Sequence, residues 1–184
     1  MHKLDIHIGA TLWLTGYPSS GKTTIATAVL TKLESLSVPV ILLDGDEVRP
    51  IIAADIDYSS RGRAQSLQRY IDLCRILVRA KALTIVSVNN HAQTQREQAR
   101  EAFPPGQFFE VWVDTPLDIC KQRDVKGLYK AAIEGKVSNV VGVDIAYEPP
   151  QSHDLRVPTL HYSADEGAMK IIQHLIECGI LARR

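Results

Sequence analysis

The sequence predicts an α/β fold, with a mostly parallel sheet of five strands and helices on both faces of that sheet. Two observations lead to this prediction. Short apolar runs alternate with longer amphipathic segments along the chain, which is the pattern of parallel strands joined by helical crossovers. One run, residues 40–43, is apolar at every position, as in strands that are covered on both faces. The 184 residues suit a single domain, residues 1–184, with a sizeable core.

Five runs are short and apolar enough to be the strands of this sheet. Each is rich in β-branched, leucine or aromatic residues and is followed by turn residues or by a helix-like segment. The expected strands are residues 11–15, 40–43, 83–88, 108–113 and 159–162.

The segments between these runs have the period and the end signals of helices. In residues 23–36, for example, Ile25 and Val29 fall near one face. Ser163 and Glu166 have the spacing of a capping box, and Gly179 is well placed to end the last helix. The expected helices are residues 23–36, a short turn or helix at 49–54, then 61–81, 93–103, 117–122, 128–134 and 163 to about 178.

Composition and charge narrow the classes of function. Lys+Arg and Asp+Glu number 21 each, so no overall basic field favours a nucleic-acid partner. No run is apolar and long enough to span a bilayer, and the first residues lack the apolar stretch of a secretory signal. The three cysteines are far apart and odd in number, which favours a reducing cytoplasm over a disulfide framework.

Residues 16–23, GYPSSGKT, match the complete phosphate-loop pattern G-x-x-x-x-G-K-[ST]. Its glycines let backbone N–H groups turn toward a phosphate, the lysine supplies a point charge, and the threonine hydroxyl can ligate a nucleotide-bound Mg²⁺. An apolar run precedes the loop and a helix follows it, as the motif requires. A glycine-serine turn before a helix is the alternative interpretation. The predicted nucleotide-binding residues are Gly16, Ser19, Ser20, Gly21, Lys22, Thr23 and Thr24.

Polar residues follow the other expected strands where those strands end. In a parallel sheet, ligands bind beyond the carboxyl ends of the strands. Asp44 and Asp46 follow the second run and could hold Mg²⁺ or position an acceptor hydroxyl; the alternative is an Asp-Gly turn with solvated carboxylates. Asn89 and Asn90 follow the third run, and Asp114 the fourth. The predicted metal ligands are Thr23, Asp44 and Asp46.

Basic residues are expected to supply charge to the transferred and accepting groups. Arg49 and Arg63 could clamp an anionic substrate. Residues 124–150 have no clear period, and a long excursion of this kind is typical of a functional lid or of a disordered loop. Arg123 and Lys126, at its start, could close over a transferring phosphoryl group. Arg96 and Arg100, four residues apart, are expected to be surface residues rather than site residues.

These motifs together resemble the adenylylsulfate (APS) kinase family. The resemblance implies a phosphate-loop kinase fold, Mg-ATP as the phosphoryl donor, a lid over both substrates, and often a homodimer. It also implies transfer of the ATP γ-phosphate to the 3′-hydroxyl of APS. The residues that carry it are the segments LDGDEVR at 43–49, RDVKGLYK at 123–130, GVD at 142–144 and YEPP at 147–150.

The departures from the family pattern cluster on the acceptor side. The family has Gly-Phe-Ser-x-x-Asp-Arg-x-x-Asn-x-Arg-Arg after the second strand, which Tyr58, Ser59, Arg63 and Arg69 fit. Gly62, Ser66 and Gln68 stand where aspartate, asparagine and arginine are usual, and Asn90-His91-Ala92 replaces Ser-Pro-Phe or Ser-Pro-Tyr. Val140 replaces a phenylalanine that packs on the APS adenine in the family, and Tyr17-Pro18-Ser19 replaces Leu-Ser-Gly in the phosphate loop.

The sequence therefore predicts an ATP-dependent kinase whose acceptor is a nucleotide-like small molecule, most simply APS. One alternative is a sister kinase acting on a cytidine-diphosphate derivative in capsule biosynthesis. Another is a nucleotide-binding module without turnover. The predicted catalytic residues are Asp46, Lys22 and Arg123. The predicted substrate-binding residues are Asp46, Arg49, Tyr58, Arg63, Asn89, Asn90, Lys126 and Val140.

Overall fold

A five-stranded sheet forms the centre of the molecule. The computed structural model describes residues 4–183. The sheet has the order β3-β4-β2-β5-β6, and every neighbouring pair is parallel, so the predicted fold class is confirmed. Its strands are β2 (Ala10–Thr15), β3 (Val40–Asp44), β4 (Leu83–Ser87), β5 (Phe108–Asp114) and β6 (Leu155–Pro158).

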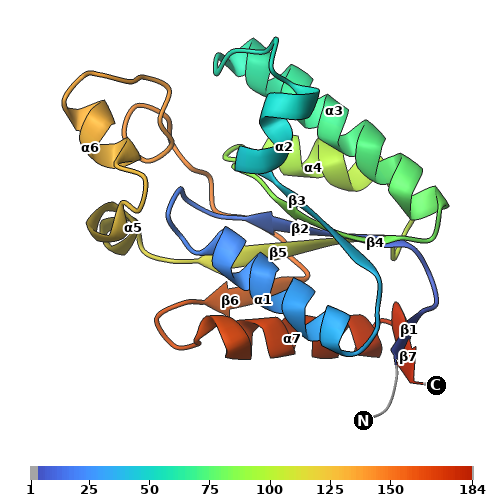
Figure 1. Ribbon diagram of the computed structural model, residues 1–184. Helices are drawn as coiled ribbons and strands as arrows, with labels where there is room; N and C mark the ends of the chain where they lie inside the picture. Colours follow the sequence, from blue (N-terminus) through green and yellow to red (C-terminus); the bar gives the residue numbers. More distant parts are fainter. Residues whose placement is uncertain (1–3, 184) are drawn as a thin grey trace.

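Helices cover both faces of this sheet (Figure 1). Helices α1 (Lys22–Ser35) and α7 (Ala164–Glu177) pack together on one face, and α3 (Ser60–Arg79) and α4 (Gln93–Glu101) cover the other. The central strand β2 serves both cores, because Leu12 and Leu14 belong to the first core and Trp13 to the second. This alternation follows from the two-residue period of a strand.

Three shorter helices lie at the end of the sheet where the strands finish. They are α2 (Gly45–Ile52), α5 (Leu117–Arg123) and α6 (Leu128–Ile133). Helix α2 begins directly after β3, with Asp44 as its N-cap. Helices α5 and α6 and the loops beside them project from the body of the molecule at the left of Figure 1.

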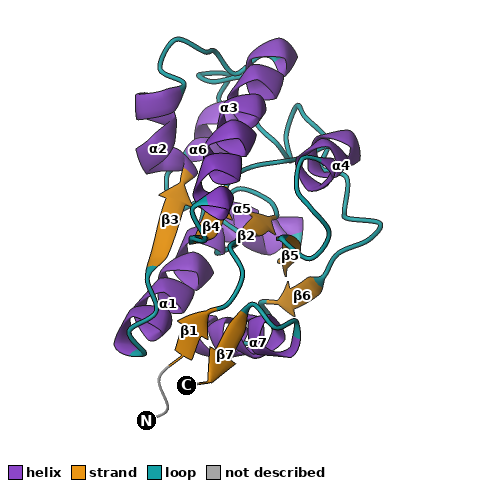
Figure 2. Cartoon of the chain, turned by 90° about the vertical axis from the view of Figure 1, so that its right-hand side faces the viewer, coloured by secondary structure: helices purple, strands orange, loops and turns teal. Residues whose placement is uncertain are grey.

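A two-stranded antiparallel ribbon at the opposite end was missed by the sequence analysis. Strand β1 (Leu4–Ile6) pairs with β7 (Leu181–Arg183), so segments from the two ends of the chain lie side by side (Figure 2). Three-residue strands give too short a pattern for periodicity to detect. None of the helices in residues 4–183 is both long and apolar enough to cross a membrane.

The prediction for the fifth strand was wrong. The strand is β6, Leu155–Pro158, while residues 159–162 form a turn after it. β6 is an edge strand, so only Val157 is fully buried, and the exposed Arg156 pairs with Asp114. One buried side chain in four residues leaves no apolar run to recognise. At the other edge, Ile41 of β3 is 37% exposed, so this strand is not covered on both faces as expected.

The prediction that Arg96 is a surface residue was also wrong. Its side chain is fully buried and forms an ion pair with Glu110 of β5 at 3.0 Å. The same guanidinium donates to the carbonyls of Asn90, at 2.9 Å, and Glu148, at 2.7 Å. A buried charge is retained where it is paired and hydrogen-bonded. Arg96 thus joins the loop after β4 to the chain that returns from α6. Arg100 is partly exposed and pairs with Asp154.

Candidate active site

A cavity of about 730 Å³ lies at the carboxyl ends of the central strands. The phosphate loop, α2, α3, the loop after β4, the start of α6 and the residues after β6 all contribute to its wall. Its size is in the range of sites for small molecules and cofactors. The cavity brings together fourteen of the predicted site residues: Ser19, Ser20, Gly21, Lys22, Thr23, Thr24, Asp46, Arg49, Tyr58, Arg63, Asn89, Asn90, Arg123 and Lys126.

The phosphate loop joins β2 to α1 in a conformation that needs glycine at two positions. Gly16 has φ 151°, and an added Cβ would lie 2.6 Å from the carbonyl oxygen of Val113. Gly21 has φ 103°, which is unfavourable for residues with a side chain. Together with Ser19 at φ 59°, these turns form a compact loop at the N-terminus of α1, where anions are favoured.

Lys22 is buried at the base of this loop. Its Nζ donates to the carbonyl oxygens of Gly16 at 3.0 Å and Tyr17 at 2.7 Å. Burial lowers the pKa of Lys22 to about 8, partly offset by the nearby Asp44. The ammonium therefore remains mostly charged at neutral pH, and it is held close to the position where the motif places the terminal phosphates.

Thr23 and Asp44 form a pair suited to a metal ion. The Thr23 hydroxyl donates to Asp44 Oδ2 at 2.6 Å, and the Ser87 hydroxyl lies 3.4 Å from Thr23 Oγ1. Asp44 is buried, and its other oxygen accepts from the backbone N–H of Asp46. One hydroxyl and one carboxylate are the donors expected for Mg²⁺ that also coordinates substrate phosphates and water. The residues present therefore fit a nucleotide-bound magnesium ion.

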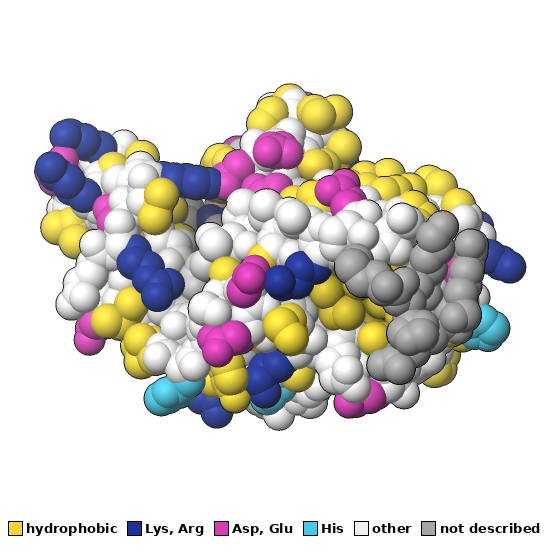
Figure 3. Space-filling model, turned by 60° about the horizontal axis from the view of Figure 1, so that its bottom comes forward, with side chains coloured by type: hydrophobic (Ala, Val, Ile, Leu, Met, Phe, Trp, Pro, Cys, Tyr) yellow, Lys and Arg dark blue, Asp and Glu magenta, His cyan; other side chains and the backbone are white. Residues whose placement is uncertain are grey.

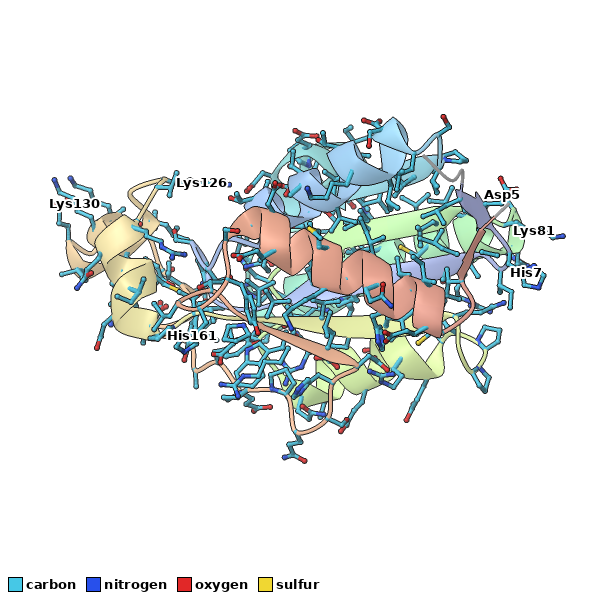
Figure 4. All side chains as sticks on the ribbon, turned by 90° about the horizontal axis from the view of Figure 1, so that it is seen from below. Asp5, His7, Lys81, Lys126, Lys130 and His161 are labelled. Atoms are coloured by element: carbon cyan, nitrogen blue, oxygen red, sulfur yellow. The ribbon has the colours of Figure 1, made fainter. Side chains whose placement is uncertain are left out.

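Asp46, on the first turn of α2, forms an ion pair with Lys126 at the start of the lid. The partners lie 80 positions apart in the sequence, and the pair brings the lid against the cavity wall. Figure 4 shows Lys126 and Lys130 together at this end of the molecule, away from Asp5 and His7 at the other end. Both side chains of the pair are largely exposed, so the contact is easily exchanged for one with a substrate.

Arg49 is held in a fixed orientation on the acceptor side. Its guanidinium lies 4.0 Å from the centre of the Tyr58 ring and donates to the carbonyls of Ile56 at 3.1 Å and Asp57 at 2.6 Å. It also contacts the buried Ser66 hydroxyl at 3.3 Å. A positive, planar group supported in this way is suited to bind a phosphate or sulfate group.

Arg63 and Tyr129 attach the lid to the body. Arg63 donates to the carbonyl of Asn139 at 2.5 Å, and the buried Tyr129 hydroxyl donates to the carbonyl of Pro18 at 3.0 Å. The predicted lid, residues 124–150, thus contacts both the phosphate loop and Arg63 on the cavity wall. Figure 3 shows Lys and Arg side chains on the projecting lobe that contains the lid, at the left of that view.

Arg123, at the end of α5, lines the cavity and contacts the phosphate loop. Its Nη1 lies 3.4 Å from the carbonyl oxygen of Ser20, which also accepts from the Thr115 hydroxyl at 2.7 Å. The Thr115 hydroxyl lies 2.6 Å from that of Thr159. These contacts place Arg123 on the donor side of the cavity.

Val140 does not lie on the cavity wall. Its side chain is buried in a small apolar cluster with Cys120 of α5 and Tyr129 of α6. The expected contact between Val140 and the acceptor is therefore not made in this arrangement of the lid. Gln68 also lies away from the cavity, because it bonds Asp72 and Gln98 on the surface.

Gly62 is required by the position of Asp57. An added Cβ at Gly62 would lie 2.2 Å from Asp57 Oδ1 and 2.5 Å from its carbonyl oxygen. The family pattern has glycine at the position of Asp57 and aspartate at position 62, so this chain has the reverse arrangement. The Asp57 carboxylate, which accepts from the Ser59 hydroxyl at 2.6 Å, occupies the space where a side chain at position 62 would begin.

This reversal predicts a reciprocal effect on stability. We expect Gly62→Asp to lower the free energy of unfolding by about 1–3 kcal/mol, because the new side chain overlaps Asp57. The double variant Asp57→Gly/Gly62→Asp is expected to recover part of that loss, because the overlap with the Asp57 carboxylate disappears while the close contact with the main-chain carbonyl of residue 57 remains, and because an acidic residue suits the first turn of a helix. Urea denaturation of the two single variants and the double variant tests this coupling. Simple additivity of the two single effects would contradict it.

Sequence reasoning missed several residues on the cavity wall, among them Tyr70, Ser87 and Tyr162. Ser87 is the last residue of β4, and its position at a strand end was an available signal. Tyr70 lies on the buried face of α3, between Leu67 and Cys74. A tyrosine on an apolar stripe is predicted to be a core residue. Its place on the cavity wall depends on the packing of α3, which the stripe alone does not indicate.

The fold and this cavity together define a phosphate-loop kinase. A model of the family described as adenylylsulphate kinase matches residues 8–158, and the chain belongs to that family. An adenylyl-sulfate kinase of Vibrio cholerae serotype O1 is 36% identical over 174 residues, covering 95% of this chain and 81% of the relative. One from Shigella flexneri is 36% identical over 171 residues, covering 93% of this chain and 83% of the relative.

Solved structures agree with these sequence relatives. The Mycobacterium tuberculosis APS kinase, solved in complex with AMPPNP and APS, has a TM-score of 0.88 and 35% identity, covering 92% of this chain and 98% of that one. A shikimate kinase from Acinetobacter baumannii has a TM-score of 0.54 at 20% identity, over 92% and 94% of the two chains. This second likeness is one of fold alone.

Proposed function

We propose that this protein transfers the γ-phosphate of ATP to the 3′-hydroxyl of APS. The observation that carries the proposal is a single cavity with two chemically distinct sides. The phosphate loop with Lys22 and Thr23 forms one side, and Arg49 with Tyr58 forms the other. Asp46 belongs to the helix that connects them, just after the Thr23 partner Asp44 and one turn before Arg49. The complex of the Mycobacterium tuberculosis relative with AMPPNP and APS supports this assignment of the two sides.

The arrangement suits an in-line transfer. The loop amides and Lys22 bind the β- and γ-phosphates of ATP, while Arg49 and Arg63 bind the phosphosulfate of the acceptor. A bond forms between the acceptor oxygen and the γ-phosphorus as the bond to the β–γ bridging oxygen breaks, leaving ADP. Asp46 orients the attacking hydroxyl and accepts its proton. Arg123 and Lys126 stabilise the charge on the transferring phosphoryl group.

Mg²⁺ completes the donor side. Thr23 and Asp44 are the residues that would hold it, with Asp46 close by on the following turn. When bound, the ion neutralises negative charge on the phosphate oxygens.

A second acceptor class follows from the altered residues on the acceptor side. Gly62 and Ser66 replace the polar side chains of the family pattern, and Ser66 contacts Arg49 directly. A smaller side chain at this position suits a different nucleotide, such as a cytidine-diphosphate derivative. Buried polar contacts discriminate strongly between acceptors, because a mismatched partner leaves groups unpaired.

One experiment separates these acceptors. ADP release is measured with Mg-ATP and a panel of APS, other nucleoside phosphates and cytidine-diphosphate derivatives. We expect APS to give the highest kcat/KM. A higher value with a cytidine-diphosphate derivative would assign the sister function. ATP binding without turnover on any acceptor would support a nucleotide-binding module.

The organisation of the protein completes the proposal. Residues 1–184 form one kinase domain with its lid at about 124–150, working in the cytoplasm as a homodimer. Several large apolar side chains are exposed and available to an interface, including Ile51 and Ile76. Sedimentation at several protein concentrations measures the oligomeric state.

A further inference from the structure

Tyr70 lines the cavity and carries a buried hydroxyl without a hydrogen-bond partner among the described residues. Its ring packs in the core formed by α3, α4 and the sheet, and the residue is only 3% exposed. Its hydroxyl oxygen is fully buried and has no hydrogen-bond partner among the described residues. The buried Tyr129, by contrast, donates to the carbonyl of Pro18 at 3.0 Å.

An unpaired buried hydroxyl is unfavourable and uncommon. Buried tyrosines ordinarily find a partner for the O–H group, and a phenylalanine would fill the same core space without this cost. A binding site is one place where such a group is retained, because the ligand supplies the missing partner. Asn90, across the same cavity, repeats the pattern, since its side-chain nitrogen is buried without a partner and the residue is 6% exposed.

The surroundings of Tyr70 define what the hydroxyl can bind. Burial raises the pKa of Tyr70 to about 12. Two smaller effects oppose each other, because Arg49 lowers this pKa and Asp44 raises it. The phenol therefore stays neutral and can donate at any physiological pH. The nearby Arg49 guanidinium is already oriented by Tyr58, Asp57 and Ser66. A neutral donor beside an oriented cation is complementary to an oxygen that carries negative charge.

We propose that the Tyr70 hydroxyl is a specificity-determining group that donates a hydrogen bond to an anionic oxygen of the acceptor, alongside Arg49. This inference rests on the proposed function, and it adds to that function a contact from the middle of α3. Tyr70 is held in place by the core cluster of α3, α4 and the sheet.

Tyr70→Phe tests the contact by combining kinetics with stability. We expect the KM for APS to rise about tenfold, as for loss of one hydrogen bond to a charged group, while the KM for ATP stays within about twofold. We expect the melting temperature to stay the same or rise, because the variant removes an unpaired hydroxyl and keeps the ring. A purely structural hydroxyl would give the opposite combination, with lower stability and an unchanged KM.

Tyr129→Phe is the matched control for stability. It removes the same atom from another buried tyrosine, but one whose hydroxyl has a partner. We expect the melting temperature to fall in Tyr129→Phe and not to fall in Tyr70→Phe. Equal losses in the two variants would overturn the inference, because they would mean that the Tyr70 hydroxyl has a partner within the protein.

Calorimetric titration with APS, in the presence of a non-hydrolysable ATP analogue, separates this inference from the proposed function. If the wild-type protein binds APS without phosphorylating it, the proposed function fails, and a weaker Kd in Tyr70→Phe still supports the Tyr70 contact. If the wild-type protein phosphorylates APS and the variant has the same KM and Kd, the function holds and the Tyr70 contact is overturned. If the wild-type protein neither binds nor phosphorylates APS, both are overturned.

Discussion

Replacing Lys22 with alanine is expected to lower kcat about a thousandfold or more, because the ammonium stabilises charge that develops on the phosphate oxygens during transfer. The side chain is buried and directed at the loop that encloses the phosphates. Two other cations on the cavity wall do not occupy its position, since Arg123 contacts the Ser20 carbonyl and Lys126 is paired with Asp46. Steady-state kinetics at saturating ATP and acceptor measure the effect.

Lys32→Ala is the matched control for this variant. Lys32 lies on the same helix and makes only a partly exposed ion pair with Asp165 at 3.2 Å. Such pairs contribute little to stability, so this variant should keep wild-type kcat and nearly wild-type stability. Near-normal turnover in Lys22→Ala would exclude the phosphate loop as the donor site.

Replacing Asp46 with asparagine is expected to abolish most turnover while ATP still binds. Asparagine keeps the shape of the side chain but cannot accept the proton of the acceptor hydroxyl, and general bases contribute about 10²–10⁴-fold to rate. The ion pair with Lys126 is also lost, but it is exposed and contributes little to stability. A fall in kcat of about a hundredfold or more, with the Kd for ATP unchanged within about twofold, is the expected result.

Asp55→Asn provides the comparison for Asp46→Asn. Asp55 is another exposed carboxylate on the same side of the protein, and it is paired with Arg69 rather than with the lid. Its loss should leave kcat unchanged. If Asp46→Asn instead weakened ATP binding and kept kcat at saturation, Asp46 would be a nucleotide-binding residue and the proton would need another acceptor.

The donor side could be predicted from sequence because its parts are local. The phosphate loop is eight consecutive residues between a strand and a helix, and Asp44 and Asp46 directly follow the next strand. Parallel pairing then brings these strand ends to one edge, with Asp44 opposite Ser87. Long periodic helices such as α3 could be predicted equally well, because their apolar stripes repeat several times.

The parts that sequence reasoning missed depend on contacts between distant segments. Arg96 is four residues from the partly exposed Arg100 on the same helix, yet it is buried because Glu110 and the carbonyl of Glu148 reach it. Val140 was expected beside the acceptor and instead packs against Cys120 and Tyr129. Tyr70 has the spacing of a core residue, and only its position relative to the cavity suggests a role. These outcomes depend on tertiary packing, which no local pattern contains.

The burial of Lys22 makes nucleotide binding a proton-coupled reaction. In the free protein burial lowers the pKa of this lysine to about 8, whereas bound phosphates favour the charged form and raise the pKa again. Below about pH 8 the Lys22 ammonium is already charged, so ATP binding takes up few protons. Above about pH 8 ATP binding must draw a proton from solution, so the affinity for ATP should fall as the pH rises. Titration calorimetry at pH 8 should therefore give heats that change with the ionisation enthalpy of the buffer, and this dependence should vanish in Lys22→Ala.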